Sequence, residues 1–116
     1  MKLRLQGNSI RLRLSQAEVA QLASGVTVEE KIEFSPANSL TYAIEPSEEP
    51  LSCEFSGDAI RILLPRDEAR LWANSEEVGI YGVSAKVSIA IEKDFRCLHD
   101  RPGEDEADSF PNPASA

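Results

Sequence analysis

Two stretches of this chain, 50 residues apart, repeat each other. Residues 7–23 read GNSIRLRLSQAEVAQLA, residues 57–73 read GDAIRILLPRDEARLWA, and the two align without a gap. A second match pairs residues 43–45 with residues 90–92, both AIE, at an offset of 47, which implies a three-residue difference in an intervening loop. A repeat of this kind predicts two copies of one structural unit, related by a pseudo-twofold axis.

Each copy begins with a pattern typical of a β-hairpin. In residues 2–5 and 10–14, apolar and polar side chains alternate with the period of two that half-buried strands show. The Gly-Asn pair at residues 7–8 stands between them, and both residue types tolerate the positive φ of a tight turn. Because residues 57–58 are Gly-Asp, the same hairpin is predicted in the second copy.

A short helix is predicted after each hairpin. Ser15 precedes Glu18 by three residues, the spacing of a capping box, in which each side chain satisfies a backbone N–H group at the helix start. In the second copy, Glu68 matches Glu18 and Pro65 replaces Ser15, which is compatible with a helix start. Residues 24–25, Ser-Gly, end the first helix. The side chains expected to face the core are Val19, Leu22, Ala69 and Trp72.

Two further strands are predicted after each helix. They are residues 26–34, 40–45, 78–83 and 86–92. The ββαββ unit, used twice, predicts an α+β fold: an antiparallel sheet or a partly closed barrel with two short helices. We expect a single domain over residues 1–95, made of repeats 1–46 and 51–95, followed by an acidic, Pro-containing tail over residues 96–116.

Length and charge exclude several classes of protein. A chain of 116 residues has the size of one domain, and its net charge of −8 argues against non-specific binding to nucleic acid. No apolar run approaches the ~18 residues of a membrane helix, and no signal-peptide segment follows Met1. We therefore expect a cytoplasmic protein that binds neither nucleic acid nor membrane. No glycine-rich phosphate loop is present, and the sequence indicates no cofactor.

The first hairpin concentrates positive charge on one face. With its apolar side chains turned inward, Lys2, Arg4, Arg11 and Arg13 point outward together, and no acidic residue precedes Glu18. Like charges across a hairpin repel, so the cluster is expected to meet an anion. It is either an ordinary solvated face whose anions are the protein's own glutamates, or a site for an anionic ligand or an acidic partner. The second hairpin lacks most of this charge, so an anion site would be asymmetric.

The end of the chain carries the opposite charge. Residues 94–116 contain six acidic and two basic residues, which accounts for half of the net charge. Phe110 is an apolar anchor in this polar segment. We expect the tail to contact either the basic hairpin or another protein through Glu104, Asp105, Glu106 and Phe110.

Cys97 and His99 are the candidates for metal binding. A thiolate and an imidazole suit zinc or copper, but a tetrahedral site requires four ligands and the chain has one histidine. We therefore expect no metal there, and expect Cys97 to pack against the end of the last strand. Cys53 lies in an apolar alternation and is expected to be a small core residue.

Two segments, GNSIRLRL at residues 7–14 and EKDFRCL at residues 92–98, resemble those of a small bacterial family of unknown function. The resemblance extends over nearly the whole chain. It implies a bacterial cytosolic protein with the same duplicated core, and it implies no activity, cofactor or catalytic residue.

The separation of charge along the chain favours a non-enzymatic binding or accessory module. In this interpretation the basic hairpin face and the acidic tail are the binding elements, and the partner is another protein or the tail itself. One alternative is an enzyme or sensor that acts on a small phosphate-type anion, with the four hairpin cations as its ligands. A second alternative is a metal-binding protein that uses Cys97 and His99.

Overall fold

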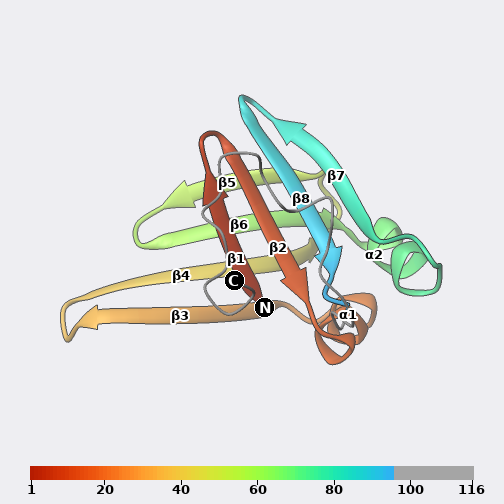
Figure 1. The fold of residues 1–116 in the computed structure, drawn as a ribbon, viewed down its shortest axis with the longest axis horizontal. Helices are drawn as coiled ribbons and strands as arrows, with labels where there is room; N and C mark the ends of the chain where they lie inside the picture. The colour runs from red at the N-terminus through yellow and green to blue at the C-terminus, as the bar shows by residue number, and fades with distance from the viewer. Residues whose placement is uncertain (96–116) are drawn as a thin grey trace, which may run out of the picture.

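The computed structural model describes residues 1–95, in which the ββαββ order occurs twice (Figure 1). The elements are β1 (Lys2–Gln6), β2 (Ser9–Leu14), α1 (Gln16–Ala23), β3 (Val28–Ser35), β4 (Asn38–Ser47), β5 (Ser52–Ser56), β6 (Ala59–Pro65), α2 (Arg66–Ala73), β7 (Gly79–Ser84) and β8 (Val87–Lys93). The α+β class and the duplicated unit are confirmed. The predicted tail, residues 96–116, lies outside the described residues.

The strands form two four-stranded sheets that exchange hairpins between the repeats. Sheet A has the order β1-β2-β8-β7, and sheet B has the order β3-β4-β6-β5. Each sheet therefore joins the first hairpin of one repeat to the second hairpin of the other, and the strands that meet, β2 with β8 and β4 with β6, are parallel. The sheets are mixed rather than antiparallel, and they do not close into a barrel. Local periodicity predicts each hairpin, but it carries no signal for which hairpins pair, because that contact is non-local.

The local sequence signals produce the turns and the helix starts that they predict. Gly7 and Gly57 have φ angles of 55° and 58°, a left-handed conformation that glycine adopts without a Cβ clash. The Ser15 side chain accepts from the Glu18 N–H, and the Glu18 carboxylate accepts from the Ser15 N–H at 2.9 Å. α2 begins directly after Pro65, as expected.

The core lies between the inner faces of the two sheets and the two helices, which pack together at one end of the molecule (Figure 1). Its most deeply buried side chains are Leu12, Leu14, Leu22, Ile44, Ile62, Leu64 and Ile91. The four side chains expected to face inward from the helices are all buried. Cys53 is half-buried and packs against this core rather than within it. Neither described helix is long enough or apolar enough to cross a membrane.

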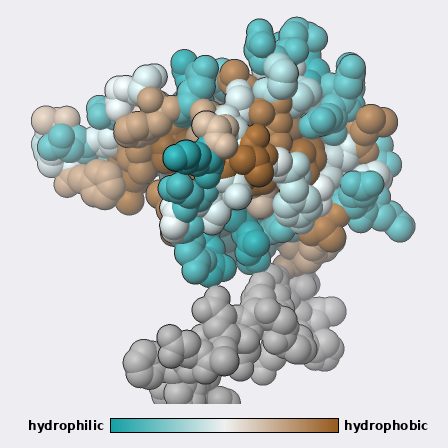
Figure 2. All heavy atoms as spheres, turned by 90° about the horizontal axis from the view of Figure 1, so that it is seen from above, coloured by the Kyte–Doolittle hydropathy of each residue, from teal (hydrophilic) through white to brown (hydrophobic). Residues whose placement is uncertain are grey.

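The β3–β4 hairpin extends beyond the core. β3 and β4 have 8 and 10 residues, whereas their counterparts β7 and β8 have 6 and 7. The overhang exposes apolar side chains of β3, with Ile32 at 47% and Phe34 at 67%. Figure 2 shows hydrophobic residues exposed among polar ones toward the end of the molecule where Figure 1 places this hairpin.

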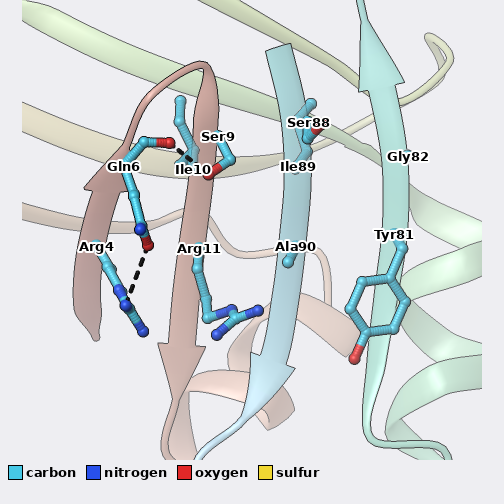
Figure 3. Close-up of a pocket in the computed structure, with 10 residues that line it drawn as sticks. All are labelled: Arg4, Gln6, Ser9, Ile10, Arg11, Tyr81, Gly82, Ser88, Ile89 and Ala90. Atoms are coloured by element: carbon cyan, nitrogen blue, oxygen red, sulfur yellow. Dashed lines mark hydrogen bonds between the residues drawn. The ribbon is translucent and has the colours of Figure 1, made fainter. Parts of the chain in front are cut away.

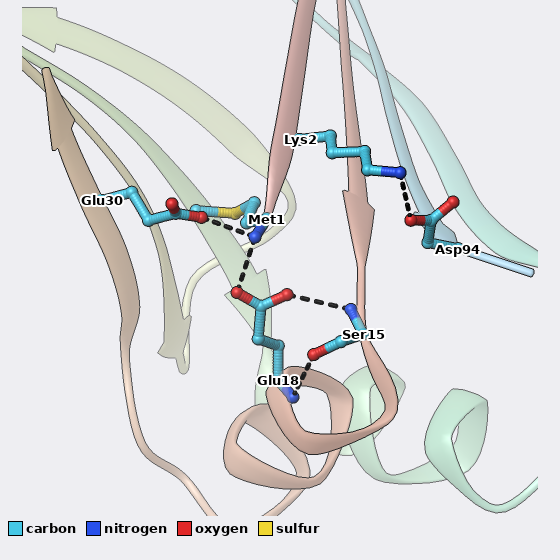
Figure 4. Close-up of polar contacts among 6 residues, drawn as sticks. All are labelled: Met1, Lys2, Ser15, Glu18, Glu30 and Asp94. Carbon is cyan, nitrogen blue, oxygen red and sulfur yellow. Dashed lines mark hydrogen bonds and ion pairs between the residues drawn. The ribbon is translucent and has the colours of Figure 1, made fainter.

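The amino group of Met1 connects the two sheets and a helix (Figure 4). It lies 2.7 Å from a carboxylate oxygen of Glu18 on α1 and 2.5 Å from one of Glu30 on β3. Burial alone would lower the pKa of the amino group, but the two carboxylates outweigh it and raise the pKa above 8.0. For Glu18 burial has the opposite effect and would raise the pKa of the carboxyl group. The Met1 ammonium group and the hydrogen bonds of the helix cap outweigh burial and hold this pKa below 4.5. Glu18 therefore has a second role besides helix capping.

Candidate functional site

The four predicted cations lie together on the outer face of sheet A. Lys2 and Arg4 come from β1, and Arg11 and Arg13 come from β2. The antiparallel register places Lys2 opposite Arg13 and Arg4 opposite Arg11. We refer to the surface formed by these four side chains as the basic face.

Two acidic residues contact cations of the basic face, one on β8 and the other directly after it. The carboxylate of Glu92 lies 3.4 Å from Arg11 Nε and 3.6 Å from Arg13 Nε, and Lys2 Nζ lies 2.8 Å from Asp94. The side chain of Glu92 is only 13% exposed. Carboxylates of the protein itself therefore pair with cations of the basic face. Such pairing is what the interpretation as an ordinary solvated face expects.

Tyr81 on β7 bounds the basic face on the far side of β8. Its hydroxyl donates a hydrogen bond of 2.7 Å to the second carboxylate oxygen of Glu92. This bond, together with burial, raises the pKa of Tyr81 above 10.0. Glycine at position 79 leaves room for the phenol, because a Cβ there would lie 2.8 Å from the Tyr81 oxygen. Glu92 thus fixes a cation on one side and an aromatic ring on the other.

Between these groups the sheet surface is hollowed. The hollow has a volume of about 440 Å³, and its wall includes Arg4, Arg11 and Tyr81. Small side chains also line it, Ser88 and Ala90 from β8 and Ser9 from β2. Figure 3 shows the Arg11 guanidinium extending from β2 toward β8 and the Tyr81 ring on the other side of β8. The hollow presents positive charge and hydrogen-bond donors, the chemistry that holds an anion.

Pairing places the wall residues in one row across the four strands. Arg4 is opposite Arg11, Arg11 is beside Ala90, and Ala90 is opposite Tyr81. The equivalent row of sheet B contains Glu54, Arg61, Ala43 and Glu29. The arginine on the inner strand and the alanine next to it are thus common to both sheets, whereas the two outer positions differ.

The outer positions of the two rows carry opposite chemistry. Sheet A has a guanidinium and a phenol at the places where sheet B has two carboxylates. The pair of arginine and glutamate recurs, with Arg61 Nε 3.5 Å from Glu45. Because sheet B forms the same strand order without them, the architecture of the unit does not require Arg4 or Tyr81.

Sequence reasoning found the four cations but missed Glu92, Tyr81 and the hollow. A signal for Glu92 was present, since the AIE repeat marks Glu45 and Glu92 as equivalent. Its contact with Arg11 depends on the pairing of β2 with β8, which the repeat does not reveal. Tyr81 has no signal in the repeat, because its counterpart is a glutamate.

Several predicted residues lie outside the described part of the chain. These are the tail contacts Glu104, Asp105, Glu106 and Phe110, and the candidate metal ligands Cys97 and His99. Within residues 1–95, no group of three or more His, Cys, Asp or Glu side chains is placed to hold a metal ion. The thiol of Cys53, within that range, has a raised pKa because of burial and the nearby Glu54.

A second, larger groove of about 630 Å³ lies between the two helices and the end of β8. Its lining is mainly apolar and includes Val19, Ala20 and Phe95. Phe95 is the last described residue, so the surroundings of this groove on that side are not described. Among the described residues that line it, the charged side chains are Lys93 and Asp94, fewer than on the basic face.

A family model described as a family of unknown function, DUF7009, matches residues 1–114. No curated protein is significantly similar to the chain.

Proposed function

Because the chain belongs to DUF7009, a family of unknown function, we propose its role from the geometry of sheet A: a non-enzymatic module that binds an acidic segment of another protein on its basic face. One observation carries this proposal. At equivalent positions of two sheets with the same fold, sheet A has Arg4 and Tyr81 where sheet B has Glu54 and Glu29. Since the fold does not require Arg4 or Tyr81 at these positions, binding of a partner explains their presence.

The clustering of charge on the basic face supports an anionic partner. Four cations share one surface of a chain whose net charge is −8. Positive charge on an acidic protein steers acidic partners to one place and orients them there. The acidic tail, with Glu104, Asp105 and Glu106, is the competing occupant within the same chain.

The test is a titration of the full-length protein with a short synthetic peptide rich in glutamate. We expect chemical-shift changes at backbone amides of β1, β2 and β8, and an affinity that falls steeply as salt is added. Arg11→Gln should weaken binding about tenfold, equivalent to about 1.4 kcal/mol. Arg61→Gln is the matched control, because Arg61 has the same glutamate contact on the other sheet, and it should leave the affinity unchanged.

A second variant separates the partner from the tail. In the full chain, Glu104→Gln, Asp105→Asn and Glu106→Gln together remove three tail charges. If the tail occupies the basic face, this variant will bind the peptide more tightly than the natural chain and shift the amides of β1 and β2 before any peptide is added. An unchanged affinity assigns the face to another protein. Equal weakening by Arg11→Gln and Arg61→Gln would refute the proposal.

A further inference from the structure

One edge of sheet B, formed by β3, is open to another strand. β3 is the outermost strand of this sheet, and in residues 1–95 it pairs with β4 alone. Figure 1 shows the β3–β4 hairpin extending past the ends of the other strands. An open edge presents backbone N–H and C=O groups that can form hydrogen bonds with a strand of another chain.

This edge also carries apolar side chains in contact with solvent. Ile32 and Phe34 are both exposed, although β3 begins with the buried Val28. Ile32 lies on the same side of the strand as Val28, so it continues the inner face of sheet B beyond the core. Its partner on β4, Leu40, is half-buried. A strand that pairs with β3 would place its own side chains against Ile32 and remove it from water.

The sequence of β3 is complementary to itself. When two copies pair antiparallel about a twofold axis at Ile32, each Lys31 lies opposite the Glu33 of the other copy. The two Ile32 side chains then meet at the axis on the inner face. Within one chain, Lys31 Nζ lies 3.8 Å from the Glu33 carboxylate, and both side chains are more than half exposed. Such a screened contact contributes little, so these charges are available for pairing between copies.

Neighbouring registers of the same pairing bring like charges together. An axis at Lys31 would place two Lys31 side chains opposite each other, and an axis at Glu33 would do the same with two glutamates. An axis at Glu30 would oppose two further glutamates, each of which already contacts the amino group of Met1. Of these four registers, charge therefore favours the one centred on Ile32.

The other three sheet edges are less suited to pairing between copies. The edges of β5 and β7 contact each other, since the Cys53 N–H donates a hydrogen bond of 3.2 Å to Ser84 Oγ. β1 carries Lys2 and Arg4 and has no acidic residue, so two copies of β1 would oppose like charges. β3 is thus the edge at which both charge and apolar surface favour a second copy.

We propose that β3 of one copy pairs with β3 of a second copy, which joins two B sheets into one continuous sheet across a homodimer. The contact is isologous, because the twofold axis at Ile32 gives both copies the same interactions. It involves sheet B rather than the basic face, so it stands or falls independently of the proposed function. An interface centred on one strand pair is small, so the dimer dissociates on dilution.

The experiment measures the mass of the full-length protein in solution by analytical ultracentrifugation, from about 1 μM to about 1 mM. We expect the mass to rise from 12.7 kDa toward twice that value. Lys31→Glu opposes acid to acid and Glu33→Lys opposes base to base, so each variant alone should dimerise at least about tenfold more weakly. An equimolar mixture of the two should regain association, because each variant is complementary to the other.

A matched control uses the opposite edge of the same sheet. Glu54→Lys on β5 makes the same change of charge as Glu33→Lys and should leave the association unchanged. Ile32→Lys, which places two cations at the axis, should abolish it. Circular dichroism of each variant verifies that the fold is intact.

Hydrogen exchange supplies a second readout of the same contact. In the natural chain, backbone amides of residues 31–35 should exchange more slowly as the protein concentration rises. A monomer at every concentration would overturn the proposal. Dimerisation that neither single charge variant weakens, or that the mixture of the two does not restore, would also overturn it.

Discussion

Arg11 and Arg61 hold the same position in the two sheets, and each contacts a glutamate on the neighbouring parallel strand. Arg11 Nε lies 3.4 Å from Glu92, and Arg61 Nε lies 3.5 Å from Glu45. Their side chains are exposed to nearly the same degree, 41% and 45%. This arginine–glutamate pair is therefore a property of the duplicated unit, whereas the groups that flank it differ between the sheets.

The first prediction concerns stability at this pair. Arg11→Gln and Arg61→Gln should each lower the free energy of unfolding by less than about 1 kcal/mol, because both ion pairs are partly exposed and screened by solvent. Denaturant unfolding of the two variants measures this. A loss above about 2 kcal/mol for Arg11→Gln alone would show that Arg11 is retained for folding rather than binding.

The second prediction concerns the pH dependence of stability through Glu18. Its folded-state pKa is depressed below 4.5, so its contribution is present above pH 4.5 and is lost as the pH falls through the lower folded value. The Met1 amino group has a pKa raised above 8.0, so its contribution is complete below pH 8.0 and is lost as the pH rises through the folded value. Urea unfolding across this range should show stability declining at both ends.

Two variants of Glu18 separate the ion pair from the cap. Glutamine serves at this position of a capping box, so Glu18→Gln keeps the cap, should remove the Glu18 part of the acid-side dependence, and should weaken the alkaline-side dependence that comes from Met1. Glu18→Ala also removes the cap and should cost about 1 kcal/mol more. If Glu18→Gln has the same acid profile as the natural chain, the ion pair with Met1 does not contribute to stability.

The third prediction compares two glycines of β7. A Cβ at position 79 would lie 2.7 Å from the Ile91 carbonyl oxygen, which is backbone and cannot move aside, so Gly79→Ala should cost about 1–3 kcal/mol. A Cβ at position 82 would meet the end of the Leu51 side chain at 2.6 Å, which can change rotamer, so Gly82→Ala should cost less. Thermal unfolding of both variants checks this order. Equal losses would contradict the close packing of Tyr81 and the β8 backbone around position 79.

The fourth prediction concerns the titration of Tyr81. The hydrogen bond to Glu92 raises the pKa of Tyr81 above 10.0, and Glu92→Gln should bring it back toward that value. A raised phenol pKa stabilises the fold below pH 10.0, and this contribution is lost as the pH rises through the folded value. Since the ring is exposed, the contribution should be below about 1 kcal/mol.

Tyrosine carbon shifts followed by NMR against pH measure this pKa directly. Tyr42 is the internal control, because its pKa is raised by burial and by Glu30 and Glu18 rather than by Glu92. Movement of both tyrosines in Glu92→Gln would indicate a general change in structure and would contradict a local hydrogen bond.

Much of the fold follows from short-range sequence patterns. The hairpin turns need a positive φ that glycine provides at residues 7 and 57, and the capping box at Ser15 and Glu18 marks the helix start through contacts within a single turn. The alternation of apolar and polar residues also places the four cations on one face, since side chains alternate across any strand. These features were predictable because the interactions that produce them join residues close together in the sequence.

The tertiary structure alone decided which hairpins share a sheet. The hairpin of residues 2–14 pairs with the hairpin of residues 79–93 from the other repeat, through the parallel contact of β2 with β8. This contact brings Glu92 close to Arg11 and places Ala90 between Arg11 and Tyr81. Hairpins with the same apolar inner face can pair in several ways, and the choice depends on how two sheets and two helices together bury a common core. The sequence therefore determined the basic face, and the packing of the two repeats determined the hollow within it.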